Sequence, residues 1–278
     1  MIFPRVLIYG MGMMGASLAH ALRKQGTRVD GVVRSEKSRQ EIARLNLAED
    51  IFLSGSVSTE IFDDYDLVVL CIPIVQELDL LSRLKARTMI TNISSTAAAA
   101  RENYRASLRF VASHPMCGSD LQGPAAFVPD LYAGKLCFII EGTPYPADQE
   151  KVIEFWQSIG MKTFCIRGED HDAMLAYLSH GPHLLSSLLV RWARPALRFA
   201  KGSPLGVTGG GFKDMARIAG SNPEMWASIL QTNREEVRRA LQEFEQGLRE
   251  VLDRLDEGPD YWIAWQKEAR AARDDLYG

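Results

Sequence analysis

The sequence predicts an α/β protein with a parallel-sheet domain at its N-terminus and an all-helical domain behind it. Strand-like runs alternate with helix-like segments through the first half of the chain. The strand-like runs are apolar at consecutive positions, which is typical of parallel strands covered on both faces. Beyond residue 168 we find no further strand-like run, so we expect domains over residues 1–168 and 169–278.

The elements of the first domain follow from short apolar runs and the periodic segments between them. Strands are expected at Val6–Tyr9, Arg28–Val33, Ile51–Leu53, Asp66–Pro73, Thr88–Thr91, Phe110–Ala112, Cys137–Ile140 and Thr163–Cys165. Helices are expected at Ala16–Leu22, Lys37–Leu45 and Val75–Leu84.

The second domain consists of amphipathic segments with helical spacing. Asp172–Phe199 is expected to be one long helix, kinked at Pro182 and broken near Pro195, with a loop after it. Further helices are expected at Phe212–Ala219, Pro223–Leu255 and Pro259–Leu276. The apolar stripe of the long helix Pro223–Leu255 needs a partner surface, either within the chain or on a second copy.

Composition narrows the class of protein. A hydrophobic content of 46% and a charged content of 24% are ordinary for a globular domain. The net charge of −3 argues against binding nucleic acid through a basic surface. We find no apolar run of membrane-spanning length, no signal peptide and no C-x-x-C pair among the four cysteines. We therefore expect a cytoplasmic protein with reduced thiols.

The glycine motif at residues 10–15 predicts the ligand of the first domain. Gly10, Gly12 and Gly15 form G-x-G-x-x-G between an apolar strand and a helix, which is the Rossmann arrangement for a dinucleotide. The helix N-terminus offers free N–H groups to the pyrophosphate. Four further residues are expected to contact the cofactor, namely Met13, Met14, Ile72 and Pro73. A purely structural glycine turn is the alternative.

The end of the second strand favours NADP over NAD. An acidic residue there usually holds the ribose 2′-hydroxyl of NAD. Here that position is Val33, followed by Arg34 and Ser35, a cation and a hydroxyl suited to a 2′-phosphate. Asp30 lies too early in the strand. Alternatively, Arg34 is solvated or stacks on the adenine, and both cofactors work.

Polar residues concentrate in three later segments. Residues 91–96 and 113–120 each follow a predicted strand, where ligands bind in such sheets, and residues 210–223 place charges on a short helix after a loop. Simpler explanations are a helix N-cap for Ser94 and Ser95, and a structural role for His114.

Together these segments resemble the prephenate/arogenate dehydrogenase family of tyrosine biosynthesis. The resemblance rests on H-P-M-x-G at 114–118, D-H-D at 170–172 with S-H at 179–180, G-F-K-D-x-x-R-I at 211–218 and N-P-x-x-W at 222–226. It implies a Rossmann domain joined to a helical dimerisation domain, and hence a homodimer. It also implies NAD(P)-dependent oxidative decarboxylation of a cyclohexadienol.

The resemblance also assigns roles to individual residues. It implies that His114 is the catalytic base and that Ser95 hydrogen-bonds the substrate hydroxyl. Arg217 would bind a substrate carboxylate, and His180 would be a second active-site histidine. The remaining expected substrate contacts are Asp120, Lys213, Glu224 and Trp226.

Several of these assignments have plainer alternatives. His180 could be a helix-surface histidine near His183, and Trp226 could belong to the core or reach the site from a partner subunit. No acidic or cysteine ligand accompanies His180 and His183, so we expect no metal. The family's S-V-K motif reads Ser95-Thr96-Ala97 here, which removes a lysine.

Glu224 is the residue from which we predict a preference between prephenate and arogenate. Arogenate has an ammonium where prephenate has a keto oxygen, so a carboxylate near that end favours arogenate. Glu224 also starts a helix, where it could simply stabilise the N-terminal dipole. The alternatives are a 4-amino-4-deoxyprephenate dehydrogenase, a β-hydroxyacid-type dehydrogenase, which would need a helical lysine base, and a non-catalytic NADP-binding protein.

Overall fold

The computed structural model describes residues 2–101, 108–118, 121–200 and 208–277. The chain divides into two compact units, Met1–Val237 and Arg238–Gly278. The first unit holds both sheets and every predicted site residue. The predicted domain boundary at residue 168 stays a prediction.

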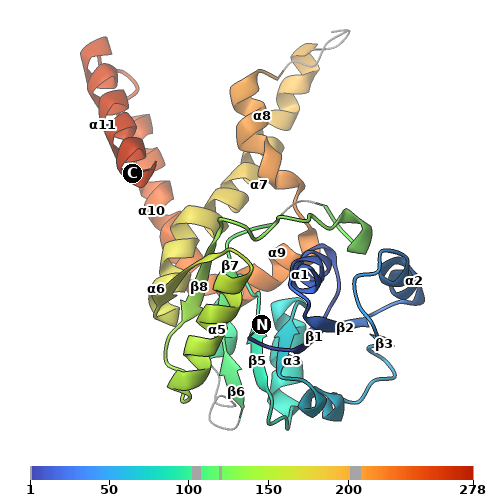
Figure 1. Ribbon diagram of the computed structural model, residues 1–278. Helices are drawn as coiled ribbons and strands as arrows, with labels where there is room; N and C mark the ends of the chain where they lie inside the picture. The colour runs from blue at the N-terminus through green and yellow to red at the C-terminus, as the bar shows by residue number, and fades with distance from the viewer. Residues whose placement is uncertain (1, 102–107, 119–120, 201–207, 278) are drawn as a thin grey trace. The chain divides into compact units, whose positions relative to one another are not determined.

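A six-stranded, wholly parallel sheet forms the centre of the first unit (Figure 1). Its strand order is β3-β2-β1-β4-β5-β6. The strands are β1 (Arg5–Tyr9), β2 (Arg28–Val33), β3 (Ile51–Leu53), β4 (Leu67–Leu70), β5 (Met89–Asn92) and β6 (Arg109–Val111). The order reverses between β1 and β4, which creates a crevice at their carboxyl ends where ligands bind in such folds.

Helices cover both faces of this sheet, as the apolar strands predict. They are α1 (Met13–Lys24), α2 (Glu36–Arg44), α3 (Ile74–Arg83) and the short α4 (Ala98–Arg101), with a 3-10 helix at Thr59–Asp64. In β1, Val6 and Ile8 belong to one buried cluster and Leu7 to a second. Alternate residues of one strand therefore enter two separate cores, one on each face.

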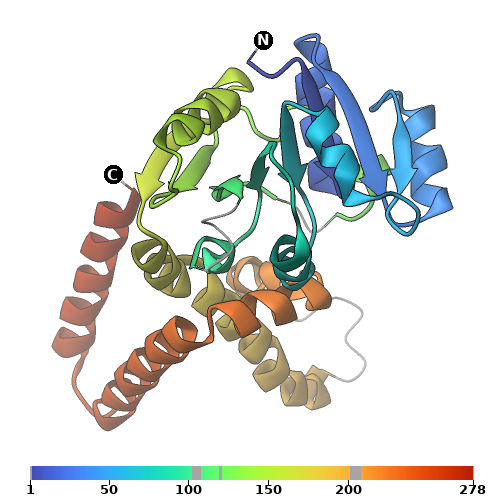
Figure 2. The same cartoon turned by 90° about the horizontal axis from the view of Figure 1, so that it is seen from below.

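A second sheet departs from the prediction of a single parallel one. β7 (Ser113–Pro115) pairs antiparallel with β8 (Leu136–Ile140), which pairs parallel with β9 (Lys162–Ile166). The helix α5 (Pro146–Ser158), which the sequence reading missed, joins β8 to β9 and packs beside β6 (Figure 2). The antiparallel partner of β8 is only three residues long, too short to show a periodicity.

The described residues after Ile166 contain helices and no strand, as expected. They form α6 (Gly168–Leu175), a π-helical turn (Ala176–His180), α7 (Gly181–Ala193), a 3-10 helix (Arg194–Ala200), α8 (Gly210–Ala216), a 3-10 helix (Arg217–Gly220), α9 (Pro223–Thr232), α10 (Arg234–Asp253) and α11 (Pro259–Tyr277). No helix in the described part of the chain is long and apolar enough to cross a membrane.

The prediction of one helix over Pro223–Leu255 is wrong, because Asn233 separates α9 from α10. Its backbone leaves the helical region at φ −120° and ψ 30°. Its buried side chain donates to the backbone oxygen of Asp172 at 2.8 Å and lies 3.0 Å from His180 Nδ1. Tertiary hydrogen bonds stabilise this break, and the helical periodicity of the sequence gives no sign of it.

Candidate active site

The glycine loop has the geometry that a dinucleotide requires. Gly10 has a φ of +105°, and a Cβ there would lie 2.4 Å from the Cys71 carbonyl oxygen. A Cβ on Gly15 would lie 2.2 Å from the Gly10 oxygen, so only glycine lets α1 pack so close to β1. A Cβ on Gly12 would meet no atom within 4 Å, which leaves room for a pyrophosphate beside the backbone.

The other predicted cofactor residues surround this loop in different ways. Met13 opens α1 with its side chain in the core, and no side chain caps the helix, so its first N–H groups are available to phosphate. Met14 is half-buried, and its carbonyl accepts from Tyr132. Ile72 lies against Gly10, and Pro73 caps α3. These residues fit a nicotinamide dinucleotide, whose pyrophosphate the N-terminus of α1 would hold.

Val33 ends β2, and the two polar residues after it point to solvent. Arg34 and Ser35 are exposed, and Arg34 makes no ion pair within the described residues. Ser35 caps α2 by accepting from the backbone N–H of Ser38 at 3.2 Å. Arg34 therefore presents an exposed guanidinium directly after the carboxyl end of β2, and the N-terminus of α2 is capped by Ser35.

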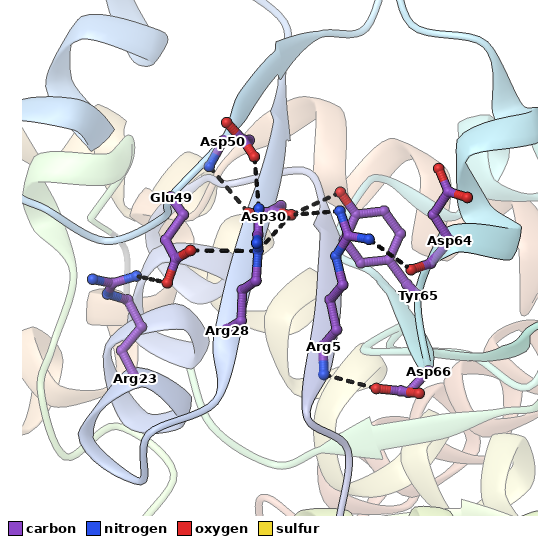
Figure 3. Close-up of polar contacts among 9 residues, drawn as sticks. All are labelled: Arg5, Arg23, Arg28, Asp30, Glu49, Asp50, Asp64, Tyr65 and Asp66. Atoms are coloured by element: carbon purple, nitrogen blue, oxygen red, sulfur yellow. Dashed lines mark hydrogen bonds and ion pairs between the residues drawn. The ribbon is translucent and has the colours of Figure 1, made fainter.

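Asp30 lies at the centre of a network of polar contacts (Figure 3). Its carboxylate is fully buried and accepts from the Tyr65 hydroxyl at 2.9 Å and the Asp50 backbone N–H at 3.0 Å. Guanidinium nitrogens of Arg5 and Arg28 lie 3.5 and 3.6 Å from Asp30 Oδ2, the oxygen that accepts from Tyr65. This network ties β2 to its neighbours, and the expectation that Asp30 does not serve the cofactor stays a prediction.

His114 lies on β7 at one end of a buried relay. Its Nδ1 is 3.0 Å from His171 Nε2, and His171 Nδ1 is 2.8 Å from Asp172 Oδ1. The carboxylate can only accept, so His171 carries its proton on Nδ1 and presents Nε2 as an acceptor. His114 then donates from Nδ1, which leaves its Nε2 lone pair free. The relay sets the tautomer that a general base needs.

Burial keeps His114 neutral. Desolvation lowers the pKa of His114 well below 6.5, and the neighbouring His171 and His180 lower it further. The imidazole is therefore unprotonated at neutral pH and able to accept a proton.

Asp172 is itself held in place by a backbone N–H and a side-chain amide. Its Oδ1 accepts from the Ala97 backbone N–H at 2.8 Å, and its carbonyl accepts from Asn233. Ala97 follows the segment that carries Ser95, between β5 and α4. The relay thus links the segment after β5 to α6 and to the start of α10.

His180 lies in the same buried group. Its Nδ1 accepts from Asn233, so its proton is on Nε2, which is buried without a hydrogen-bond partner in the described chain. Burial lowers the pKa of His180 to about 4; the Asp172 carboxylate opposes the shift, as does a contact with the Ser95 backbone that does not have the geometry of a hydrogen bond. A buried, unpartnered N–H is costly in the free protein and suits a ligand acceptor.

Trp226 extends the site toward the helical segment. Its ring stacks on His183 with centroids 3.8 Å apart and meets His180 edge-on at 5.9 Å. Its Nε1 is a second buried donor without a partner among the described residues. Trp226 therefore packs against histidines of its own chain.

His183 is a site residue that the sequence reading left aside as a neighbour of His180. Its Nδ1 bonds the Ser179 carbonyl at 3.0 Å. Burial lowers the pKa of His183, the hydrogen bond with the Ser179 carbonyl opposes the shift, and the positive charge of Arg217 adds to it. The spacing of His183 three residues after His180, within S-H-x-P-H, is the signal that could have found it.

The remaining predicted residues lie at the edge of this group or beyond it. Ser95 is half-buried, and its Oγ makes no hydrogen bond to any described residue. Lys213 is exposed on α8, Arg217 on the 3-10 turn after it, and Glu224 on the first turn of α9. Neither Lys213 nor Glu224 forms an ion pair in the described ranges. Asp120 lies outside the described residues.

No group of three histidine, cysteine, aspartate or glutamate side chains in the described part of the chain could hold a metal ion.

A Rossmann glycine loop beside a buried histidine relay defines the class of protein, a nicotinamide-dependent dehydrogenase. Two family descriptions match the chain in succession. "Prephenate dehydrogenase, nucleotide-binding domain" covers residues 18–165, and "Prephenate dehydrogenase, dimerization domain" covers residues 167–260. The chain belongs to the prephenate dehydrogenase family, which confirms the predicted family and fold class.

Individual relatives agree with this assignment. The chain is 26% identical to the cyclohexadienyl dehydrogenase of Zymomonas mobilis over 98% of this chain and 96% of the relative. It is 27% identical to the prephenate dehydrogenase of Bacillus subtilis over 98% and 76%.

Solved structures are similar over nearly the whole chain. Prephenate dehydrogenase from A. aeolicus, in complex with hydroxyphenyl propionate and NAD+, is 25% identical with a TM-score of 0.83 over 98% of both chains. Arogenate dehydrogenase from Synechocystis has a TM-score of 0.81 at 21% identity over 98% of this chain and 99% of that one, which shows a shared fold.

Proposed function

We propose that this chain catalyses the oxidative decarboxylation of prephenate or arogenate, with NADP as cofactor and arogenate as the preferred substrate. The observation that carries the proposal is the His114–His171–Asp172 relay, which leaves one neutral, buried imidazole nitrogen free to act as a base. Bound NADP supplies the hydride acceptor for C4 of the ring. The ring becomes aromatic as carbon dioxide leaves, so the step is effectively irreversible.

The protein's task is to take the proton of the C4 hydroxyl. His114 Nε2 receives it, and the imidazolium that forms is stabilised through His171 by the Asp172 carboxylate. Ser95, with no hydrogen-bond partner for its hydroxyl in the described chain, is proposed to bind the same substrate hydroxyl. The hydrogen bonds of the relay orient His114 before the substrate binds.

The substrate's carboxylates need donors, and the site has several. We assign Arg217 to one carboxylate, because a guanidinium can bind it through two parallel hydrogen bonds. His180 Nε2 and Trp226 Nε1, both buried and unpartnered in the described chain, are proposed as further donors to the ligand. His183 supports Trp226 by stacking on it. Lys213 and Asp120 stay proposed contacts.

The preference for arogenate rests on Glu224. Its carboxylate is exposed in the first turn of α9, the helix that carries Trp226. It would balance the ammonium that arogenate has and prephenate lacks. We expect Glu224→Gln to lower the arogenate-to-prephenate ratio of kcat/KM; an unchanged ratio would remove the basis for this preference.

The preference for NADP rests on the exposed Arg34 and on the absence of a carboxylate at Val33. The A. aeolicus relative was solved with NAD+, so the family accommodates that cofactor. Arg34→Ala is expected to raise the KM for NADP and to leave the KM for NAD nearly unchanged. An equal effect on both cofactors would indicate that Arg34 stacks on the adenine.

The test of the whole proposal is an assay of absorbance at 340 nm with NAD or NADP, and with prephenate, arogenate or 4-amino-4-deoxyprephenate. We expect the fastest rise with arogenate and NADP. Absence of any rise, in folded protein that binds NADP, would overturn the dehydrogenase assignment. His114→Asn should abolish turnover and keep NADP affinity, because the histidine lies on β7 and the glycine loop follows β1.

A homodimer is the proposed assembly, built through the helical part of the chain. Large apolar side chains are exposed there on α7 and, in the second unit, on α10; they include Leu188, Trp192, Phe244, Leu248 and Leu252. A second copy would cover them, as the family's dimerization domain suggests. The junction of the two family matches near residue 166 supports the proposed boundary at residue 168.

A further inference from the structure

A carboxyl group that the proposed reaction does not use lies buried beneath the site. Glu77 is in the first half of α3 and is fully buried. Its Oε1 accepts from Asn92 Nδ2 at 2.6 Å, and its Oε2 accepts a short hydrogen bond from the Ser94 hydroxyl. Both oxygens therefore hold the segment that leaves β5.

Asn92 connects this carboxyl to the strand of the catalytic base. Its Oδ1 accepts from the Ser113 backbone N–H at 2.7 Å, and Ser113 returns a hydrogen bond from its Oγ to the Asn92 carbonyl at 2.6 Å. Backbone pairing of β5 with β6 ends at Thr91 and Val111. The Asn92 side chain thus continues the pairing to Ser113, the residue before His114.

Ser94 connects the same carboxyl to the other proposed catalytic residue, because it immediately precedes Ser95. One side chain on α3 consequently anchors the backbone beside Ser95 and, through Asn92, the backbone beside His114. A movement of Glu77 would change the separation of these two residues from both sides at once.

The surroundings of Glu77 contain no cation among the described residues. Beyond the end of β4 it faces the Cys71 thiol, whose pKa is raised by burial and by this carboxyl. The segment after β5 contributes only the uncharged Asn92 and Ser94. The described side chains of α4 are alanines. The only acidic residue of α9 is Glu224, which is exposed in its first turn. On α3 itself, Asp79 forms an ion pair with Arg83 at the surface.

Burial therefore dominates the ionisation of this group. Desolvation raises the pKa of Glu77 to about 7, and the hydrogen bonds from Ser94 and Asn92 limit the rise. Both of those partners are donors. The ionised carboxylate accepts from both, whereas a protonated carboxyl must turn one oxygen into a donor and force the Ser94 hydroxyl to reorient.

We propose that Glu77 is a positioning residue for the reaction, which in its ionised form fixes the distance between Ser95 and His114 through Ser94 and Asn92. The inference rests on the proposed roles of those two residues. It adds a group that touches neither substrate nor cofactor, and it makes the alignment of the site depend on pH near neutrality.

The experiment compares the pH dependence of kcat/KM in the wild type, Glu77→Gln and Glu77→Ala. In the wild type we expect kcat/KM to fall as pH drops through about 7. Glutamine keeps an acceptor for Asn92 and cannot titrate, so this fall should disappear while kcat stays within about threefold of the wild type. Alanine should lower kcat by about 10- to 100-fold with little change in KM or in NADP affinity.

Asp79→Asn is the matched control, because it removes the same charge from the exposed face of the same helix. Its pH profile should superimpose on that of the wild type. A 13C NMR titration of glutamate-labelled protein gives a readout without turnover: one carboxyl resonance titrating near pH 7 should vanish in Glu77→Gln.

The outcomes separate the two proposals. An inactive wild type that still shows the NMR titration counts against the proposed function alone. An active wild type whose profile is shared by Glu77→Gln, or whose kcat survives in folded Glu77→Ala, would overturn the positioning role. Because glutamine is nearly isosteric, a failure of the alanine variant to fold leaves the glutamine comparison decisive.

Discussion

The chemistry of this protein depends on the order in which a few buried side chains donate and accept. Asp172 can only accept, and this fixes the proton of His171, then that of His114, and finally leaves His114 Nε2 as the proposed base. Asn233 sets the opposite tautomer on His180, with the proton on Nε2. The two histidines thus have complementary roles, one accepting a proton and the other donating a hydrogen bond.

Removal of the relay's carboxylate tests this order. Asp172→Asn offers His171 a donor as well as an acceptor, so the tautomer of His114 is no longer imposed. We expect kcat to fall by about 10²- to 10⁴-fold, as for the comparable change in a Ser-His-Asp triad, with KM changed far less. Asp170→Asn, two residues earlier and paired with Arg167 at the surface, should behave like the wild type. Equal loss in both variants would point to a damaged α6.

The same buried carboxyl that positions the site should also affect stability. The folded-state pKa of Glu77 is raised from 4.5 to about 7, so the protonated form is favoured by folding. Its contribution is fully present below pH 4.5 and is lost as pH rises through 7, a change of about 3 kcal/mol at about 1.36 kcal/mol per pKa unit. Urea unfolding at pH 5 and pH 8 should show a smaller loss of stability in Glu77→Gln than in the wild type. An equal loss in both would show that Glu77 does not titrate in this range.

At the scale of elements, two glycines of one loop have different roles, one in packing and one in ligand binding. Gly15 allows the close contact of α1 with β1, whereas Gly12 faces open space. Packing and ligand binding are therefore separable within six residues.

Gly15→Ala and Gly12→Ala make that separation measurable. The alanine at position 15 must displace α1, because its Cβ would lie 2.2 Å from a backbone oxygen, so we expect a clear drop in Tm. Gly12→Ala should keep the wild-type Tm and lose affinity for NADP, measured by calorimetry or fluorescence. Undiminished NADP binding in Gly12→Ala would place the pyrophosphate elsewhere.

The sequence predicted most elements within one or two residues, because buried parallel strands are continuous apolar runs and the helices between them have helical periodicity. Apart from the missed helix α5, it failed where a tertiary contact decides the structure. The break at Asn233 is maintained by bonds to Asp172 and His180, and β7 is held by Asn92 and β8. Neither the helix break nor the short strand produces a periodic pattern in the sequence that could reveal it.

At the scale of the molecule, the proposed dimer accounts for the apolar side chains that the described part of α7 exposes. Trp192 is 75% exposed and Leu188 is 61% exposed. Trp192→Glu should shift the protein toward monomer in light scattering, because a charge would be buried in the interface. Phe164→Glu on β9, at 56% exposure, is the matched control and should leave the mass unchanged. A monomeric wild type at micromolar concentration would contradict the proposal.

The amino-acid sequence by itself determined the family, the glycine loop, the order of most strands and helices along the chain, and His114 as the candidate base. These features are written in local patterns, such as apolar runs, G-x-G-x-x-G and H-P-M-x-G. The tertiary structure alone decided which groups act on that base. His171 and Asp172 lie 57 and 58 residues from His114 along the chain, and Glu77 lies 37 residues before it. Only folding brings these polar groups together, and only burial makes their hydrogen bonds and pKa values interdependent.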